Sequence, residues 1–209
     1  MVIYQYMVNG FFTLSRKRIS HNLIVCVLLL SIILSSCSQY DDLKPITVKQ
    51  FANFVEQTGY VTDAEKFGWS IVQKTVFNYE IVEGATWKTP NGKDKAKSLL
   101  PVTQVSYNDA IAYCKWANVQ LPSYNDYWKL AQNDTRTIIK NSDYIRVVSD
   151  VNIIGNTWDI TTSKNAKGDI RLAGGSYLCN DYTCNGTNVD RVLYVSADTG
   201  NSHISFSVY

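Results

Sequence analysis

The sequence predicts an α+β domain with little regular secondary structure, and three observations indicate this fold class. Amphipathic segments with capping residues predict helices over 47–59, 106–117 and 123–131. The chain between and after them is rich in Gly, Asn, Asp, Ser and Thr, which is typical of turns and irregular backbone. Short runs such as 144–148 and 191–195 have the composition of strands. We therefore expect a core in which Trp and Tyr side chains support loops as well as helices.

The first helix is predicted by its two ends. Thr47 with Gln50 forms a capping box, in which each side chain satisfies a free backbone N–H of the first turn. Gly59 can take the left-handed conformation that ends a helix. The same pattern over 62–68 predicts a shorter helical turn.

The second and third helices also begin at serine caps. Ser106 has Asp109 three residues later, where a carboxylate also suits the positive end of the helix dipole. Ser123 follows the break at Leu121–Pro122 and caps the third helix. The residues expected on the buried faces of the three helices are Val48, Phe51, Val55, Ala110, Tyr113, Cys114, Ala117, Tyr124, Tyr127, Trp128 and Ala131.

The first segment of the chain resembles a bacterial lipoprotein signal peptide. Basic residues at 16–18 precede an apolar run, Leu23–Leu34, of 12 residues, whereas a membrane span needs about 20. Small residues and then Cys37 follow this run at once, as in a lipobox. An ordinary signal peptide or short anchor, with Cys37 incidental, is the alternative. We expect a signal peptide over 1–36, an anchor and linker over 37–45, a domain over 46–209, and a lipid-anchored protein of the bacterial cell envelope that faces the periplasm or lies on the outer membrane.

Charge and cysteine content restrict the function further. Without residues 1–36 the chain has 17 basic and 18 acidic residues, which gives no case for nucleic-acid binding. Cys114, Cys179 and Cys184 are then the cysteines left inside the domain. The spacing of the last two, behind Gly174–Gly175, fits either a local disulfide or a redox or metal site. Cys114 is expected to be a buried small apolar residue.

Several segments resemble, in order and spacing, the formylglycine-generating enzyme or sulfatase-modifying factor family. They are 54–65, 67–70, 84–87, 101–110, 112–116, 121–123, 155–159, 174–177 and 202–206. The resemblance covers the chain from about Ile46 to Val208. It implies the compact fold of that family, which is related to C-type lectin-like domains and has little regular secondary structure.

The resemblance also implies an activity. Enzymes of this family oxidise a cysteine of an unfolded sulfatase to formylglycine with dioxygen and Cu(I), and Cys179 and Cys184 stand at their two catalytic cysteine positions. Thiolates are soft ligands that select Cu(I), and the substrate thiolate would be a third ligand. Ser176 resembles the active-site serine, and Tyr177 and His203 are expected to contact the substrate, a sulfatase or another cysteine-containing protein. This function requires the two sulfur atoms to lie together at a cleft.

Other implied features concern metals. The segment 155–159 resembles a calcium loop of the family, so Asn156 and Asp159 are candidate Ca²⁺ ligands, and a turn around a buried Trp158 is the alternative. His203 is the single histidine after residue 36. The related sulfoxide synthases hold non-haem iron with several histidines, so that branch of the family is excluded.

Departures from the family pattern support a second hypothesis. The segment 132–154 is shorter than its counterpart in typical members, and 185–188 stands where an arginine-rich run is usual. Val208 replaces the cysteine that pairs with the counterpart of Cys114 in some members. The alternative function is therefore a non-catalytic envelope lipoprotein that uses the fold as a binding or scaffold module, like the gliding-motility lipoproteins of the family.

Overall fold

The computed structural model describes residues 42–209, which fold around two buried clusters. The predicted signal peptide and Cys37, the predicted lipidation residue, lie outside the described residues. None of the helices in 42–209 has the length and apolar character to cross a membrane. The elements, in chain order, are β1 (Lys44–Pro45), α2 (Val48–Thr58), α3 (Asp63–Phe67), β2 (Trp69–Gln73), β3 (Tyr79–Glu83), α4 (Tyr107–Ala117), α5 (Tyr124–Ala131), β4 (Trp158–Lys164), β5 (Ile170–Ala173), β6 (Tyr194–Val195), β7 (Ile204–Ser205) and β8 (Ser207–Val208).

The helices confirm the predictions from capping residues. Capping boxes form in 47–50, 62–65 and 106–109, and Ser123 accepts a bond from the third residue of α5. Gly59 ends α2 with φ of 66°, in the left-handed region. Most residues predicted to face inward are buried, and Val55, Ala117 and Trp128 are partly exposed.

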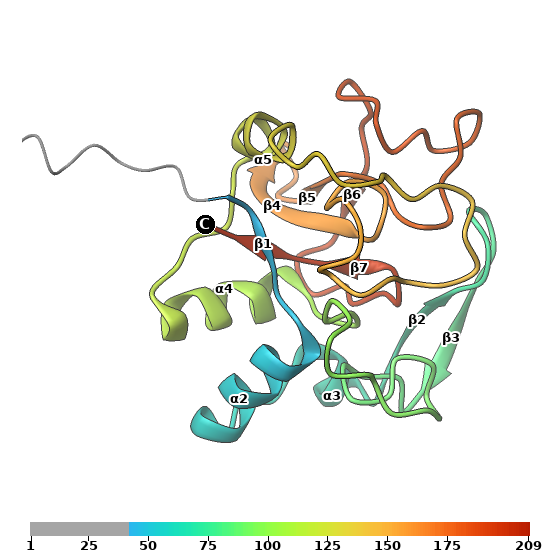
Figure 1. Ribbon diagram of the computed structural model, residues 1–209. Helices are drawn as coiled ribbons and strands as arrows, with labels where there is room; N and C mark the ends of the chain where they lie inside the picture. The colour runs from blue at the N-terminus through green and yellow to red at the C-terminus, as the bar shows by residue number, and fades with distance from the viewer. Residues whose placement is uncertain (1–41) are drawn as a thin grey trace, which may run out of the picture. The chain divides into compact units, whose positions relative to one another are not determined.

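Three small sheets complete the fold. A four-stranded sheet has the order β6-β5-β4-β7, in which β4 and β7 are parallel, while β1 pairs with β8 and β2 with β3. Figure 1 shows α5 at one side of β4 and β5, with α4 and α2 at the other side. The predicted α+β class with little regular secondary structure is thus the fold observed.

The strand predictions were less accurate than the helix predictions. The segment 144–148 is not a strand, because both the N–H and the carbonyl of Arg146 bond the side chain of Asn156. Only Tyr194–Val195 of the run 191–195 is a strand. Residues 44–45 were predicted as linker, but they form β1 on the C-terminal strand β8.

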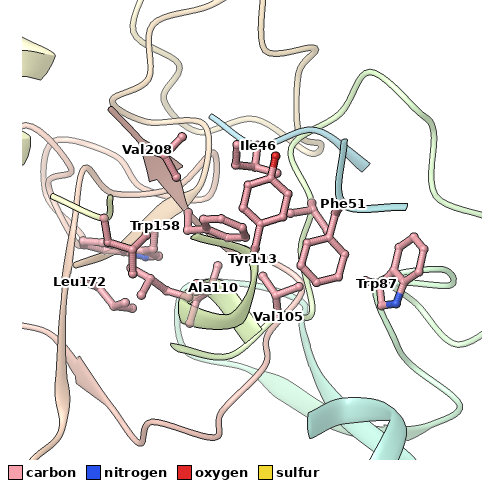
Figure 2. Packing of buried hydrophobic residues seen from close by; sticks show 14 of the residues in the cluster. Ile46, Phe51, Trp87, Val105, Ala110, Tyr113, Trp158, Leu172 and Val208 are labelled. Carbon is pink, nitrogen blue, oxygen red and sulfur yellow. The ribbon is translucent and has the colours of Figure 1, made fainter. Parts of the chain in front are cut away.

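The larger cluster is built from aromatic rings that come from distant parts of the chain. Tyr113 of α4 stacks on Phe51 of α2 at 6.0 Å and meets Phe206 edge-on at 5.3 Å. Figure 2 shows Trp158 in the same cluster, at the start of β4. Cys114 is buried there as a free thiol, and burial raises its pKa to about 12, so it is an inert apolar group.

A buried carboxylate joins α3 to α4. Asp109 accepts hydrogen bonds from the Tyr60 hydroxyl at 3.1 Å, from the Asp63 N–H at 3.1 Å and from the Ser106 N–H at 2.8 Å. Burial raises the pKa of Asp109 more than these donors lower it. Loss of this side chain would leave three donors without their acceptor.

We expect Asp109→Ala to lower the free energy of unfolding by about 3 kcal/mol, measured by denaturant titration. Asp126 is the matched control, since it holds the same position in α5 but its carboxylate, among residues 42–209, accepts only from the hydroxyl of its own cap, Ser123, at 2.6 Å. Asp126→Ala should cost about 1 kcal/mol. Equal losses in the two variants would contradict the bridging role of Asp109.

Candidate functional site

The two cysteines lie together and form a disulfide, with 5.2 Å between their Cα atoms. A tight turn between them brings them together, because Asn180 accepts bonds from the N–H groups of Tyr182 and Thr183 at 2.9 and 2.7 Å. Of the two interpretations that the sequence left open, the local disulfide is therefore the form in this structure. The dithiol required for metal binding would arise by reduction.

Ser176 links the cysteines to the histidine. Its N–H lies 3.4 Å and its hydroxyl 4.0 Å from Sγ of Cys179, and the hydroxyl lies 3.3 Å from Nδ1 of His203. Burial lowers the pKa of His203 to about 4, so the imidazole is neutral at pH 7. The predicted residues Ser176, Cys179, Cys184 and His203 thus form one connected group.

This group borders a cavity of about 360 Å³, called the cysteine cavity below. Ser176, Cys184 and His203 line it, whereas Cys179 is only 2% exposed and is not part of the lining. Most of the remaining wall is apolar. The apolar lining residues are Ile71, Val76, Tyr79, Trp158, Leu172, Leu178, Leu193, Val195 and Ile204. The pair therefore lies at a cavity wall, to which Cys184 contributes directly.

The sequence did not identify Arg191 as a site residue. It lines the cysteine cavity, and its guanidinium carbon lies 5.9 Å from the centre of the Trp158 ring. The run 191–195 was interpreted only as a strand. One signal was present in the sequence, because Arg191 is the only cationic residue after Cys184.

Tyr177, which the sequence predicts to contact substrate, does not line the cysteine cavity. Its side chain is 8% exposed and borders a separate cavity of about 650 Å³ together with Tyr144 and Arg146. Its backbone explains this placement: the N–H donates to Asn156 and the carbonyl accepts from Ser142. Tyr177 is therefore held in place by the loop over 142–156.

Asn156 and Asp159 do not fit a shared calcium site. The amide of Asn156 is used by the backbone of Arg146, at 2.8 and 2.9 Å. Asp159 lies in β4, is 2% exposed and accepts from the Ser207 hydroxyl at 2.6 Å. Burial raises its pKa to about 7, opposite to the ionised carboxylate that Ca²⁺ requires. The alternative, a turn with a buried Trp158, is the one formed.

The cysteine pair fits Cu(I) by the chemistry of its donors. Two thiolates on one short loop are soft ligands for a low-coordinate ion, and Ser176 provides hydrogen-bonding groups beside one of them. Among residues 42–209 no cluster of three or more His, Cys, Asp or Glu side chains is placed to hold a metal. A third ligand would therefore have to come from the substrate.

A family model and the similar curated proteins point to the same family. The model described as the sulfatase-modifying factor enzyme 1-like domain matches residues 42–144. The formylglycine-generating enzyme of Mus musculus is 37% identical over 103 residues, 40% of this chain and 28% of that enzyme. The inactive C-alpha-formylglycine-generating enzyme 2 of Bos taurus is 36% identical over 109 residues, 43% of this chain and 36% of that protein.

The similarity covers only part of the relatives and only part of this chain. The chain spans about a third of the length of these two relatives, and the family model match ends before the cysteine pair. The solved structure of PvdO from Pseudomonas aeruginosa has a TM-score of 0.54 and 10% identity, over 78% of this chain and 77% of that one. That likeness shows the fold alone.

Proposed function

Because this chain belongs to the sulfatase-modifying factor enzyme 1-like family, we propose that it is a formylglycine-generating oxidase. Its substrate would be a cysteine of an unfolded sulfatase or of another protein. The observation that carries the proposal is the contact of Ser176 with both Cys179 and His203 at the wall of the cysteine cavity. A purely structural disulfide has no need of these polar neighbours or of a cavity.

The net reaction balances with dioxygen and an external thiol reductant. The substrate side chain CH₂–SH loses its C–S bond and gains a C=O bond, which gives an aldehyde and hydrogen sulfide. One oxygen atom enters the aldehyde and the other leaves as water, while two molecules of the external thiol give up two electrons and two protons and form a disulfide. The same reductant opens the Cys179–Cys184 bond and prepares the site.

Each residue has a role that follows from its position. Cys179 and Cys184, once reduced, would hold Cu(I), which supplies the one-electron chemistry that lets dioxygen react. Ser176 presents its N–H and hydroxyl to the sulfur of Cys179, where they stabilise a thiolate. His203 is neutral and fixes the direction of the Ser176 hydroxyl. The apolar wall excludes water from the reacting thiol.

The test is aldehyde formation on a peptide that contains Cys-x-Pro-x-Arg, in the presence of Cu(I), oxygen and a thiol reductant, with trapping by a hydrazide. Cys184→Ser and Cys179→Ser are each expected to lower the rate by about 100-fold or more, because a hydroxyl is a poor ligand for Cu(I). Cys114→Ala is the matched control, since this thiol lies in the core and outside the cavity, and it should keep the native rate.

Absence of aldehyde from folded native protein would overturn the oxidase proposal. A native rate in both Cys179→Ser and Cys184→Ser would also overturn it. Binding of copper without aldehyde formation would support the metal site alone, and the oxidase proposal would still be overturned.

One observation favours a second candidate, a non-catalytic binding module. The inactive bovine protein is as similar to this chain as the mouse enzyme is, at 36% against 37% identity. In such a module the disulfide would be a structural cross-link that stabilises the loop. It predicts that Cys179→Ser loses stability but that the native protein forms no aldehyde under any copper or reductant concentration.

We further propose that the protein acts at the bacterial cell envelope, held by lipid on Cys37. The apolar run Leu23–Leu34 that ends before Cys37 supports this location. Mass spectrometry of the N-terminal peptide from cells is the test. A diacylglyceryl group on Cys37 is the expected result, and an unmodified Cys37 in membrane-extracted protein would contradict it.

A further inference from the structure

The cysteine cavity has an unusual charge balance. Its wall contains one cation, Arg191, and no aspartate or glutamate. The other polar side chains on the wall are neutral, including His203, whose pKa is lowered by burial. With the two cysteines joined as a disulfide, as in this structure, the single guanidinium makes the potential inside the cavity positive, and low-dielectric walls strengthen it.

Arg191 is available to a ligand. No ion pair of its guanidinium is found among residues 42–209, and its buried Nε has no hydrogen-bond partner. The backbone of Arg191 is bonded on both sides: its N–H donates to the carbonyl of Asn188, and its carbonyl accepts from the hydroxyl of Tyr124 and the guanidinium of Arg171. These bonds fix the backbone of Arg191, while Trp158 lies beside its guanidinium. The guanidinium of Arg191 is partly exposed at the cavity wall, and an anion that enters the cavity could bind it with charge-assisted hydrogen bonds.

We propose that the cysteine cavity recognises a substrate that carries a carboxylate next to the reacting thiol, and that Arg191 binds this carboxylate. The inference rests on the proposed function, since it names the substrate class of that same site. Arg191 is then a specificity-determining residue. A peptide with arginine beside the target would place two cations in a pocket without an acidic group, and it should bind poorly.

The test measures binding alone, so that it does not depend on turnover. Three pentapeptides with blocked ends carry serine at the target position, flanked on both sides by Asp, by Asn or by Arg. Calorimetric titration of the native protein should give an affinity for the Asp peptide at least about tenfold above that for its Asn isostere. The Arg peptide should bind more weakly than the Asn peptide, and the preference for Asp should shrink as salt is added.

Variants show whether the preference for Asp comes from the guanidinium of Arg191 or from positive charge in general. Arg191→Gln should bring the ratio of Asp to Asn affinities to about one, and Arg191→Lys should keep part of it. Lys167→Gln is the matched control, because this exposed residue carries the same charge outside the cavity, and it should keep the full preference.

Three results would overturn the inference: no binding of the Asp peptide at millimolar concentration, equal affinity for the Asp and Asn peptides, or a preference that survives Arg191→Gln. The comparison of the Asp and Asn peptides uses the native protein alone. The proposal can therefore be refuted even if the Arg191→Gln variant folds poorly. If no aldehyde forms but the protein still prefers the Asp peptide, the oxidase proposal alone is overturned. If aldehyde forms but the protein binds the Asp and Asn peptides equally, only the inference about Arg191 is overturned.

Discussion

Gly175→Ala is expected to lower the free energy of unfolding by about 4 kcal/mol, because the new methyl group has no room and the backbone no favourable conformation. Gly175 has φ of 71°, and a Cβ built on it would lie 2.3 Å from Cα of Gly186. The neighbour is backbone and cannot rotate away. The loop that carries Ser176 would therefore have to separate from the loop that follows Cys184, and the site would lose its geometry.

Gly168→Ala provides the control for backbone conformation. Gly168 has φ of 89°, but nothing lies within 4 Å of its added Cβ. This variant should cost about 1 kcal/mol in thermal or denaturant unfolding and leave aldehyde formation and peptide binding unchanged. If the two variants are equally stable, the contact between Gly175 and Gly186 is not what holds the two loops together.

Asp159→Asn is expected to stabilise the protein at pH 8 by about 3 kcal/mol and to have little effect at pH 4. Burial raises the pKa of Asp159 from 3.8 to about 7, so the folded state favours the neutral acid more than the unfolded state does. The stability from this group is complete below about pH 4 and is lost as the pH rises through 7. An amide has no proton to lose, it still accepts from Ser207, and its N–H can reach the Tyr127 hydroxyl, which has no well-formed bond.

The measurement is the free energy of unfolding between pH 4 and pH 8 for the native protein and two variants. Asp159→Asn should flatten the fall of stability with rising pH. Asp190→Asn removes the same charge from an exposed position and should leave that fall unchanged. A native curve that rises steadily from pH 4 to pH 8, with Asp159→Asn below it, would show that Asp159 is ionised in the folded state.

The helices could be predicted from the sequence because their signals are local. A cap such as Thr47 or Ser106 and an end such as Gly59 act within one helical turn of the residues that they satisfy. The strands could not be predicted, because most have two to five residues and depend on partners far along the chain. β1 is the clearest case, since Lys44 and Pro45 are a strand only by virtue of β8.

The candidate site was predictable to the extent that its chemistry is local or specific to the family. The cysteine spacing and Ser176 identified one loop, and the resemblance added His203 from the end of the chain. The sequence did not predict Arg191 as a site residue. Its place in the cavity depends on the contact between the loop after Cys184 and β5, where the guanidinium of Arg171 bonds the Arg191 carbonyl. Asp159 was misread because a carboxylate in a loop motif gives no sign of the burial that comes from β8.

The pairing of β1 with β8, and the parallel pairing of β4 with β7, determine the order in which the protein can assemble. Both pairings join segments far apart in the chain, so they form late and slowly compared with a local turn or helix. The turn between Cys179 and Cys184 is local and can close before these long-range pairings form. His203 joins Ser176 only when β7 docks on β4, so the cysteines of a partly folded chain can be oxidised before the wall of the site exists.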